Sequence, residues 1–140
     1  IIMIYKNASA AFEFHLGTKY KAGVILQGWE IKSFRSHGIQ LKGSYVKEIN
    51  GSFWLIGSHI SNVDKTSANE NKDPLRFREL LLTKHEMKQL RESVIKGFTI
   101  IPIEAFIERN KLKFHICLAK GKNKADKRET IKKRDLSRLE

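Results

Sequence analysis

The chain has 140 residues and a formal net charge of +12, and 41% of its residues are hydrophobic and 30% charged. This length is typical of one domain, and the apolar content can build one core, which excludes a chain that is disordered throughout. No apolar run approaches the roughly 20 residues of a membrane-spanning helix, and the single cysteine, Cys117, excludes an internal disulfide and fits a reducing cytoplasm.

Runs with apolar residues at every second position predict strands along most of the chain. The first two are Phe12–Leu16 and Gly23–Leu26. Further on, "SYVKEI" and "FWLIGSHI" flank the pair Asn50-Gly51, which predicts a tight hairpin because both residues tolerate positive φ. Near the end, "TIIPIEAFI" and "LKFHICLAK" flank "ERNK" and predict a second hairpin. In its last strand, the side chains at positions 112, 114, 116 and 118 share one face.

Two helices interrupt these strands. We expect the first over Trp29–His37, where Ile31 and Phe34 lie on one side and Gly38 follows the last turn. The second begins at a T-x-x-E capping box, which starts at Thr83. Its apolar face is predicted from Met87, Leu90 and Val94, and Gly97 ends it.

These elements predict a mainly β protein: a small antiparallel OB-like barrel of about six strands with flanking helices. The polar stretch Ser61–Pro74 is expected to be a long exposed loop. We divide the chain into an OB-like barrel over residues 1–119 and a basic C-terminal tail over residues 120–140. Because the tail has few apolar residues, we expect it to be disordered in the free protein.

Positive charge is the strongest functional signal. The last 22 residues supply +5 of the net charge, so the rest of the chain is also basic. A small domain this basic most often binds nucleic acid. Lys32 and Arg35 lie on one face of the first predicted helix and could bind adjacent phosphates. No segment pairs a basic face with a broad apolar one, so no membrane partner is expected.

Catalysis is disfavoured, because nothing in the sequence brings a histidine, a nucleophile and an acid together. The five histidines have no common metal-site spacing, so no cofactor or metal is expected. Two readings stay open for several residues. Trp29 and Trp54 could stack on bases or belong to the core, and His59 could bond RNA or fix a turn. The residues alone therefore predict an RNA-binding barrel with a basic arm.

Five motifs occur in a fixed order and cover the chain from about Asn7 to Arg134. They are "AGVILQGWEIKSFR", "GSYV", "HIS", "DPLRFRELLL" and "AKGKNKADKRETIK". Together they resemble the small protein B (SmpB) family, the bacterial partner of transfer-messenger RNA. Some positions depart from the family pattern. Asn7 is followed by "ASAA" where basic residues are usual, and Lys21 stands where an acid is common. Glu79 stands where a basic residue is usual, and Ala125 where an aromatic residue or histidine is frequent.

The resemblance implies an OB-like barrel and no enzymatic activity. It implies that the protein binds the tRNA-like domain of transfer-messenger RNA (SsrA RNA) and acts in trans-translation in the cytoplasm. There the pair rescues ribosomes stalled on messages without a stop codon and enables tagging of the incomplete peptide. The basic tail would enter the empty message channel. Further partners would be small-subunit ribosomal RNA and, indirectly, elongation factor Tu and alanyl-tRNA synthetase.

The residues and the resemblance together predict two sets of contacts. RNA contacts from the barrel and its helix are expected at Asn7, Glu30, Lys32, Ser33, Arg35, Lys42, His59, Arg76 and Arg78. Contacts of the tail with RNA and the ribosome are expected at Lys120, Gly121, Lys122, Lys124, Asp126, Lys127, Arg128, Lys132, Lys133 and Arg134. Two alternatives remain at this stage: a ribosomal or other OB-type RNA-binding protein, and a nuclease of small barrel fold.

Overall fold

The computed structural model of the chain describes residues 4–62 and 72–138. Most of the predicted loop Ser61–Pro74 therefore lies outside the described residues. The described helices and strands occur in the following order: β1 (Ile4–Lys6), α1 (Ala10–Glu13), β2 (Phe14–Val24), α2 (Gly28–His37), β3 (Tyr45–Ile49), β4 (Ser52–Ile56), β5 (Arg78–Leu81), α3 (Lys84–Ile95), β6 (Thr99–Glu108), β7 (Lys111–Gly121) and α4 (Lys124–Arg138).

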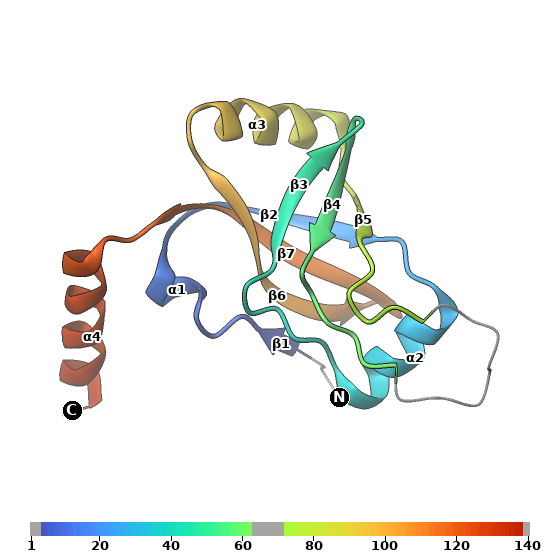
Figure 1. Cartoon of the computed structure of the whole chain (residues 1–140), viewed down its shortest axis with the longest axis horizontal. Coiled ribbons are helices and arrows are strands. Elements are labelled where there is room, and N and C mark those ends of the chain that lie inside the picture. The colour runs from blue at the N-terminus through green and yellow to red at the C-terminus, as the bar shows by residue number, and fades with distance from the viewer. Residues whose placement is uncertain (1–3, 63–71, 139–140) are drawn as a thin grey trace.

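The strands form one antiparallel sheet in the order β1-β6-β3-β4-β5-β2-β7, and pairing of β6 with β7 closes it into a barrel (Figure 1). This confirms the predicted mainly β barrel. The described residues contain seven strands, where about six were predicted. The first two predicted runs join into the single strand β2, with an irregularity between Leu16 and Lys19, while β1 and β5 are additional strands. Phe12 lies in α1 and not in a strand.

Both predicted hairpins are confirmed. Asn50 and Gly51 have φ values of 52° and 84°, and they connect β3 to β4 with Ile49 paired to Ser52. Arg109 and Asn110, with φ values of 50° and 63°, connect β6 to β7. Positive φ at both central residues gives a turn whose twist matches that of the flanking strands.

Helices α2 and α3 are confirmed close to their predicted limits. The capping box of α3 is formed, since Glu86 donates its backbone N–H to Thr83 Oγ1 at 3.1 Å and its carboxylate accepts from the Thr83 N–H at 2.9 Å. One part of the predicted apolar face is wrong. Leu90 is fully buried and Met87 packs against the core, but Val94 is exposed. The helix lies across one end of the barrel (Figure 1), and Val94 and Ile95 in its last turn are exposed.

The main hydrophobic core lies inside the barrel and is formed by side chains from several strands. The predicted shared face of β7 is confirmed, and it points inward, because residues 112, 114, 116 and 118 are all buried. Phe34 of α2 and Leu90 of α3 also join this main cluster. Cys117 is buried in a second, smaller cluster with Ala10, Ile101 and Ala119.

The tail differs from the expectation of disorder, because residues 124–138 form α4. Asn123 starts this helix: its Oδ1 accepts from the Asp126 N–H at 2.9 Å, and its own N–H points at Asp126 Oδ2 at 3.4 Å. The segment is rich in Lys and Arg, whose straight side chains lose little freedom in a helix. The preceding strand β7 runs to Gly121, so regular pairing extends past residue 119. Among the described residues, no helix is both long and apolar enough to cross a bilayer.

Candidate nucleic-acid interface

Helix α2 presents the predicted basic pair. Its first turn is held by Glu30, whose Oε1 accepts from the Gln27 N–H at 2.7 Å, and its last turn ends at Gly38, where φ is 77°. Gly38 packs against the ring of Tyr5 so closely that any side chain there would collide with it. Lys32 and Arg35 are both exposed on the solvent side of the helix. Helix α2 therefore presents the two cationic side chains from a backbone that is held in place at both ends.

A buried ion-pair network anchors α2 to β5. The Glu30 carboxylate receives Arg78 Nε at 2.5 Å on one oxygen and Arg76 Nη2 at 2.5 Å on the other. Arg78 also donates to Ser58 O at 3.0 Å and Pro74 O at 3.0 Å. Burial alone would raise the pKa of Glu30, but hydrogen bonds from Arg76, the Gln27 N–H and Arg78 outweigh it and lower that pKa.

This network corrects part of the predicted contact set. Glu30 and Arg78 are each 0% exposed, so neither can touch an RNA in this conformation. Ser33 is also buried and donates its hydroxyl to Ser61 O at 2.5 Å. A charge-assisted pair buried between two elements holds them in one arrangement, and the three residues thus position α2. Arg76 keeps about a quarter of its side chain exposed.

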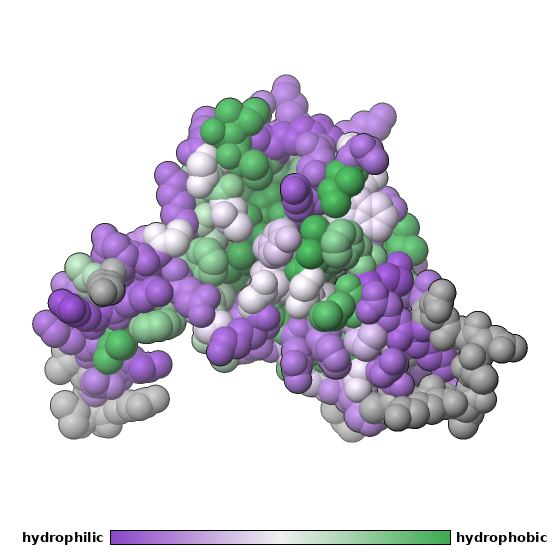
Figure 2. Space-filling model, viewed as in Figure 1, coloured by the Kyte–Doolittle hydropathy of each residue, from purple (hydrophilic) through white to green (hydrophobic). Residues whose placement is uncertain are grey.

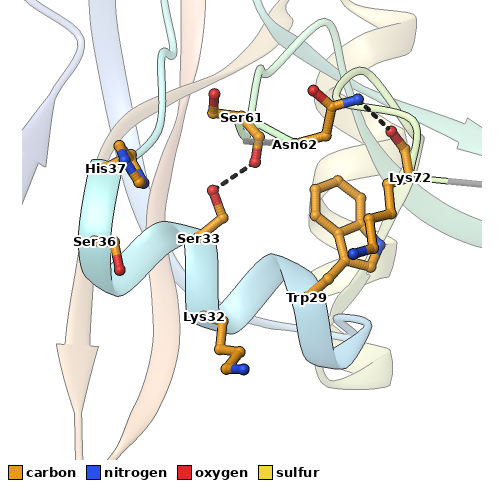
Figure 3. A pocket seen from close by; sticks show the side chains of 8 residues that line it. All are labelled: Trp29, Lys32, Ser33, Ser36, His37, Ser61, Asn62 and Lys72. Carbon is orange, nitrogen blue, oxygen red and sulfur yellow. Dashed lines mark hydrogen bonds between the residues drawn. The ribbon is translucent and has the colours of Figure 1, made fainter. Parts of the chain in front are cut away.

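A pocket of about 180 Å³ lies between α2 and the segments around Ser61 and Lys72 (Figure 3). Trp29 forms one wall with its ring beside the Lys72 side chain, and its Nε1 donates to Gln27 Oε1 at 2.7 Å. Ser33 points to Ser61, while Lys32, which also lines the pocket, directs the end of its side chain away from Ser61 (Figure 3). Trp29 is half-buried and packs against the core, which supports the core role that the sequence left open, while its stacking on a base stays a prediction.

The other predicted barrel residues lie apart from this pocket. Asn7 donates its side-chain amide to Pro102 O at 3.0 Å and ties the chain before α1 to β6. His59 pairs through its backbone with Gln40, so it helps to fix the segment that follows α2. Lys42 is exposed on the turn that precedes β3. Trp54 is half-buried on β4, opposite Glu79.

The predicted tail residues lie far from α2, at the opposite end of the molecule (Figure 1). Asp126 receives His15 Nε2 at 3.0 Å, and this contact with His15 lowers the pKa of Asp126. Lys122 Nζ donates to Ala11 O at 2.8 Å. Lys127 lies 5.7 Å from the centre of the ring of Phe12. Gly121 ends β7, Lys124 begins α4, and Lys120 lies over the Phe98 ring at 4.5 Å. The exposed residues of α4 include Arg128, Lys132, Lys133 and Arg134.

The structure adds a surface that the sequence did not indicate. Phe77 and Leu81, on the outward face of β5 and the residues before it, are each about half exposed. Leu81 and Lys113 both lie beside Gly23, where a side chain would approach Leu81 Cβ to 3.3 Å and Lys113 Nζ to 3.4 Å. Alternation along "FRELL" could have indicated the outward face, but only the structure shows that Phe77 and Leu81 stay about half exposed among the described residues.

Comparison with known proteins assigns a family. The model of the SmpB protein family matches residues 4–140. The SsrA-binding protein of Cupriavidus necator is 41% identical over 136 residues, which are 96% of this chain and 91% of the relative. The SsrA-binding protein of Coxiella burnetii is 41% identical over 133 residues, or 94% of this chain and 84% of the relative.

A solved structure gives the same picture. It is described as "tmRNA-SmpB: a journey to the center of the bacterial ribosome", and one of its chains is 33% identical in sequence. The two chains superpose with a TM-score of 0.70 over 91% of this chain and 94% of the other.

In the described part of this chain, no three His, Cys, Asp or Glu residues are grouped so that they could hold a metal ion.

Proposed function

Because this chain belongs to the SmpB family, we propose that it binds transfer-messenger RNA and acts in trans-translation on stalled ribosomes. The relatives are named for binding SsrA RNA, and the solved neighbour pairs the family with that RNA and the ribosome. The protein acts as an RNA-binding factor in the cytoplasm and performs no chemistry itself. Elongation factor Tu and alanyl-tRNA synthetase then act on the complex through the RNA.

The observation that supports an RNA face at α2 is the geometry of its cations. Lys32 and Arg35 are three positions apart, one turn along the helix, and both are exposed. Their backbone is held by the buried Glu30 network, so little conformational freedom is lost when phosphates bind. Leu81 and Lys113 line a pocket together with Gln27 and Gly28 at the start of the helix and could extend the contact.

The tail has a different task in this proposal. Helix α4 is basic and touches the barrel mainly through α1 and the start of β2. An RNA-lined channel would attract its cations, among them Arg128, Lys132 and Arg134. We infer that the barrel holds transfer-messenger RNA while the tail enters the empty message channel and contacts small-subunit ribosomal RNA.

The direct test is to isolate the protein from its host lysate and sequence the RNA that comes with it. Transfer-messenger RNA should dominate the recovered pool. A broad spread of RNAs would contradict the proposal and favour a general OB-type RNA-binding protein. In a second tube, the protein is incubated with Mg²⁺ and structured RNA. Recovery of intact RNA is expected, and cleaved RNA would indicate a nuclease instead.

A further inference from the structure

A groove away from the α2 surface is lined by large apolar side chains that the proposed RNA contacts do not involve. It lies between β3, the last turns of α3 and the start of β6, with walls formed by Tyr45, Val94, Ile95 and Phe98. We call it the β3–α3 groove. Figure 2 shows hydrophobic residues gathered in a hollow beneath α3, bordered by hydrophilic ones. Its volume is about 380 Å³.

The groove exposes large apolar side chains side by side. Ile95 is 85% exposed, Val94 48% and Tyr45 41%. Single exposed apolar residues are ordinary on a protein surface, but a contiguous set that lines a hollow marks an interaction site. Val94 and Ile95 are successive residues at the end of α3, and both side chains are exposed. Neither contributes to the core of this protein, so the fold itself does not explain why both are apolar. A partner that covers these side chains would therefore gain the free energy of burying their apolar surface.

The floor of the groove includes an unpaired strand edge. Among the described residues, β3 pairs with β6 only at Val46 and Ile100. The tight turn at Asn50-Gly51 fixes the alternation of β3, so that Glu48 directs its backbone N–H and C=O away from β4 and toward the groove. Phe98 would face Glu48 in that register, but it donates its N–H to Ser93 O at 3.1 Å instead.

The chemistry of the groove favours a polypeptide over a nucleobase. Arg91 lies 5.9 Å from the ring centre of Phe53, and Lys120 lies 4.5 Å from that of Phe98, so these two ring faces already carry a cation. Arg91 is also committed to Glu48. The unpaired edge of β3 can form backbone hydrogen bonds with a further strand of polypeptide, and an RNA has no such backbone.

The charge around the groove indicates the sign of its occupant. Lys47 on β3 and Lys96 after α3 are exposed beside the apolar walls, and Lys120 adds a third cation. Of the two nearby acids, Glu48 is paired with Arg91, and Glu92 is exposed on α3. The excess of cations complements a segment with acidic side chains.

We propose that the β3–α3 groove binds an extended segment of a partner protein. Two or three residues of the segment add to the edge of β3 through Glu48, in the manner of strand addition. An apolar side chain enters between Val94 and Phe98, and an acidic side chain meets Lys47 or Lys96. This site lies beyond the proposed RNA function, and an intact α2 surface is not needed for it.

The test begins with the full chain and a phage library of random eight-residue peptides. Enriched peptides should alternate apolar residues and contain Asp or Glu. By titration, Val94→Ser and Ile95→Ser should each weaken such a peptide about tenfold, because each removes most of an apolar contact. Leu75→Ser is the matched control, since Leu75 is 51% exposed but lies outside the groove, and it should bind the peptide normally. All three variants should keep the RNA affinity of the parent.

Hydrogen exchange reports the binding mode. The Glu48 amide should exchange more slowly when the peptide is bound, because strand addition gives it an acceptor. Three outcomes would overturn the proposal. The first is that no peptide is enriched above a blank surface. The second is that the enriched peptides bind Val94→Ser and Ile95→Ser as tightly as the parent. The third is that an eight-nucleotide uridine RNA displaces the peptide. The last would assign the groove to bases.

Discussion

Glu30 is a buried carboxylate whose two oxygens meet Arg76 and Arg78. Neither Glu30 nor Arg78 has exposed surface, yet the exposed cations of α2 depend on them for their position. At this scale the candidate interface has two kinds of residues. Lys32 and Arg35 can meet an RNA, while the buried set holds their helix.

Replacing Glu30 by Gln tests the buried set. The change leaves the Arg78 guanidinium without its counter-charge, and breaking a buried pair in this way costs about 3–5 kcal/mol. The free energy of unfolding in urea should fall by that amount. Glu92→Gln, at an exposed position on α3, should stay within about 0.5 kcal/mol of the parent. Equal stability of the two variants would contradict the anchoring role.

The pH dependence of that difference follows from the lowered pKa of Glu30. Because the folded pKa lies below the unfolded one, the stabilisation is fully present above the ordinary pKa of a glutamate. It is lost as the pH falls through the folded value. The difference in unfolding free energy between the parent and Glu30→Gln should therefore shrink across this acidic window. A difference that stays constant down to the acid transition would mean that the carboxylate is not stabilised in its charged form.

The exposed pair is tested by salt dependence. Each phosphate contact releases counterions and contributes roughly 0.7–0.9 to the slope of log affinity against log salt. Replacing Lys32 and Arg35 by Ala should weaken binding of transfer-messenger RNA and flatten the slope by about one to two. Lys84→Ala with Lys88→Ala removes the same charge from α3 and is the control. A slope that matches the parent's would mean that Lys32 and Arg35 are merely solvated.

At the scale of elements, short-range chemistry sets most boundaries. The turn at Asn50-Gly51 and the capping box at Thr83 involve residues within three positions of one another. Helix α4 follows the same rule, because Asn123 and Asp126 cap it without help from the core. Elements that depend on distant partners behave differently. The last turn of α3 continues past the core and leaves Val94 exposed at the β3–α3 groove.

Thr83→Ala tests the cap of α3. The Glu86 N–H would lose its acceptor, which costs about 1 kcal/mol for an N-cap of this kind. The loss should appear as a lower urea midpoint with an unchanged slope of the transition. Thr83→Ser keeps a hydroxyl at the same place and should recover most of the stability. If Ser destabilises as much as Ala, the hydroxyl does not contribute.

At the scale of the whole molecule, the barrel separates α2 from α4, which lie at opposite ends (Figure 1). The two proposed tasks, holding RNA and entering the ribosome, are therefore placed on surfaces that do not overlap. Both hydrophobic clusters of the described residues consist of residues before position 120, so the core does not depend on the tail. The barrel should fold without the tail.

Ending the chain after Lys122 tests this separation and keeps β7 complete. The shortened protein should bind transfer-messenger RNA with only a modest loss, because α2 is intact. It should fail to support peptide tagging on stalled ribosomes at matched protein levels. Normal tagging would reduce the tail to a solubilising segment. Loss of RNA binding in step with tagging would place the main RNA site on the tail.

The sequence by itself determined the features that depend on neighbours along the chain: the period-two strands, both hairpins, the limits of α2 and α3, the basic character and the motifs of the family. Only the tertiary structure decided which polar residues face inward. Glu30 meets Arg78 from 48 positions away, and no local pattern shows that the pair is buried. The exposure of Val94, the open edge at Glu48 and the surface at Leu81 were decided in the same way. Whether a side chain is buried depends on which distant segments of the chain pack against it, and the pattern of neighbouring residues does not show which segments these are.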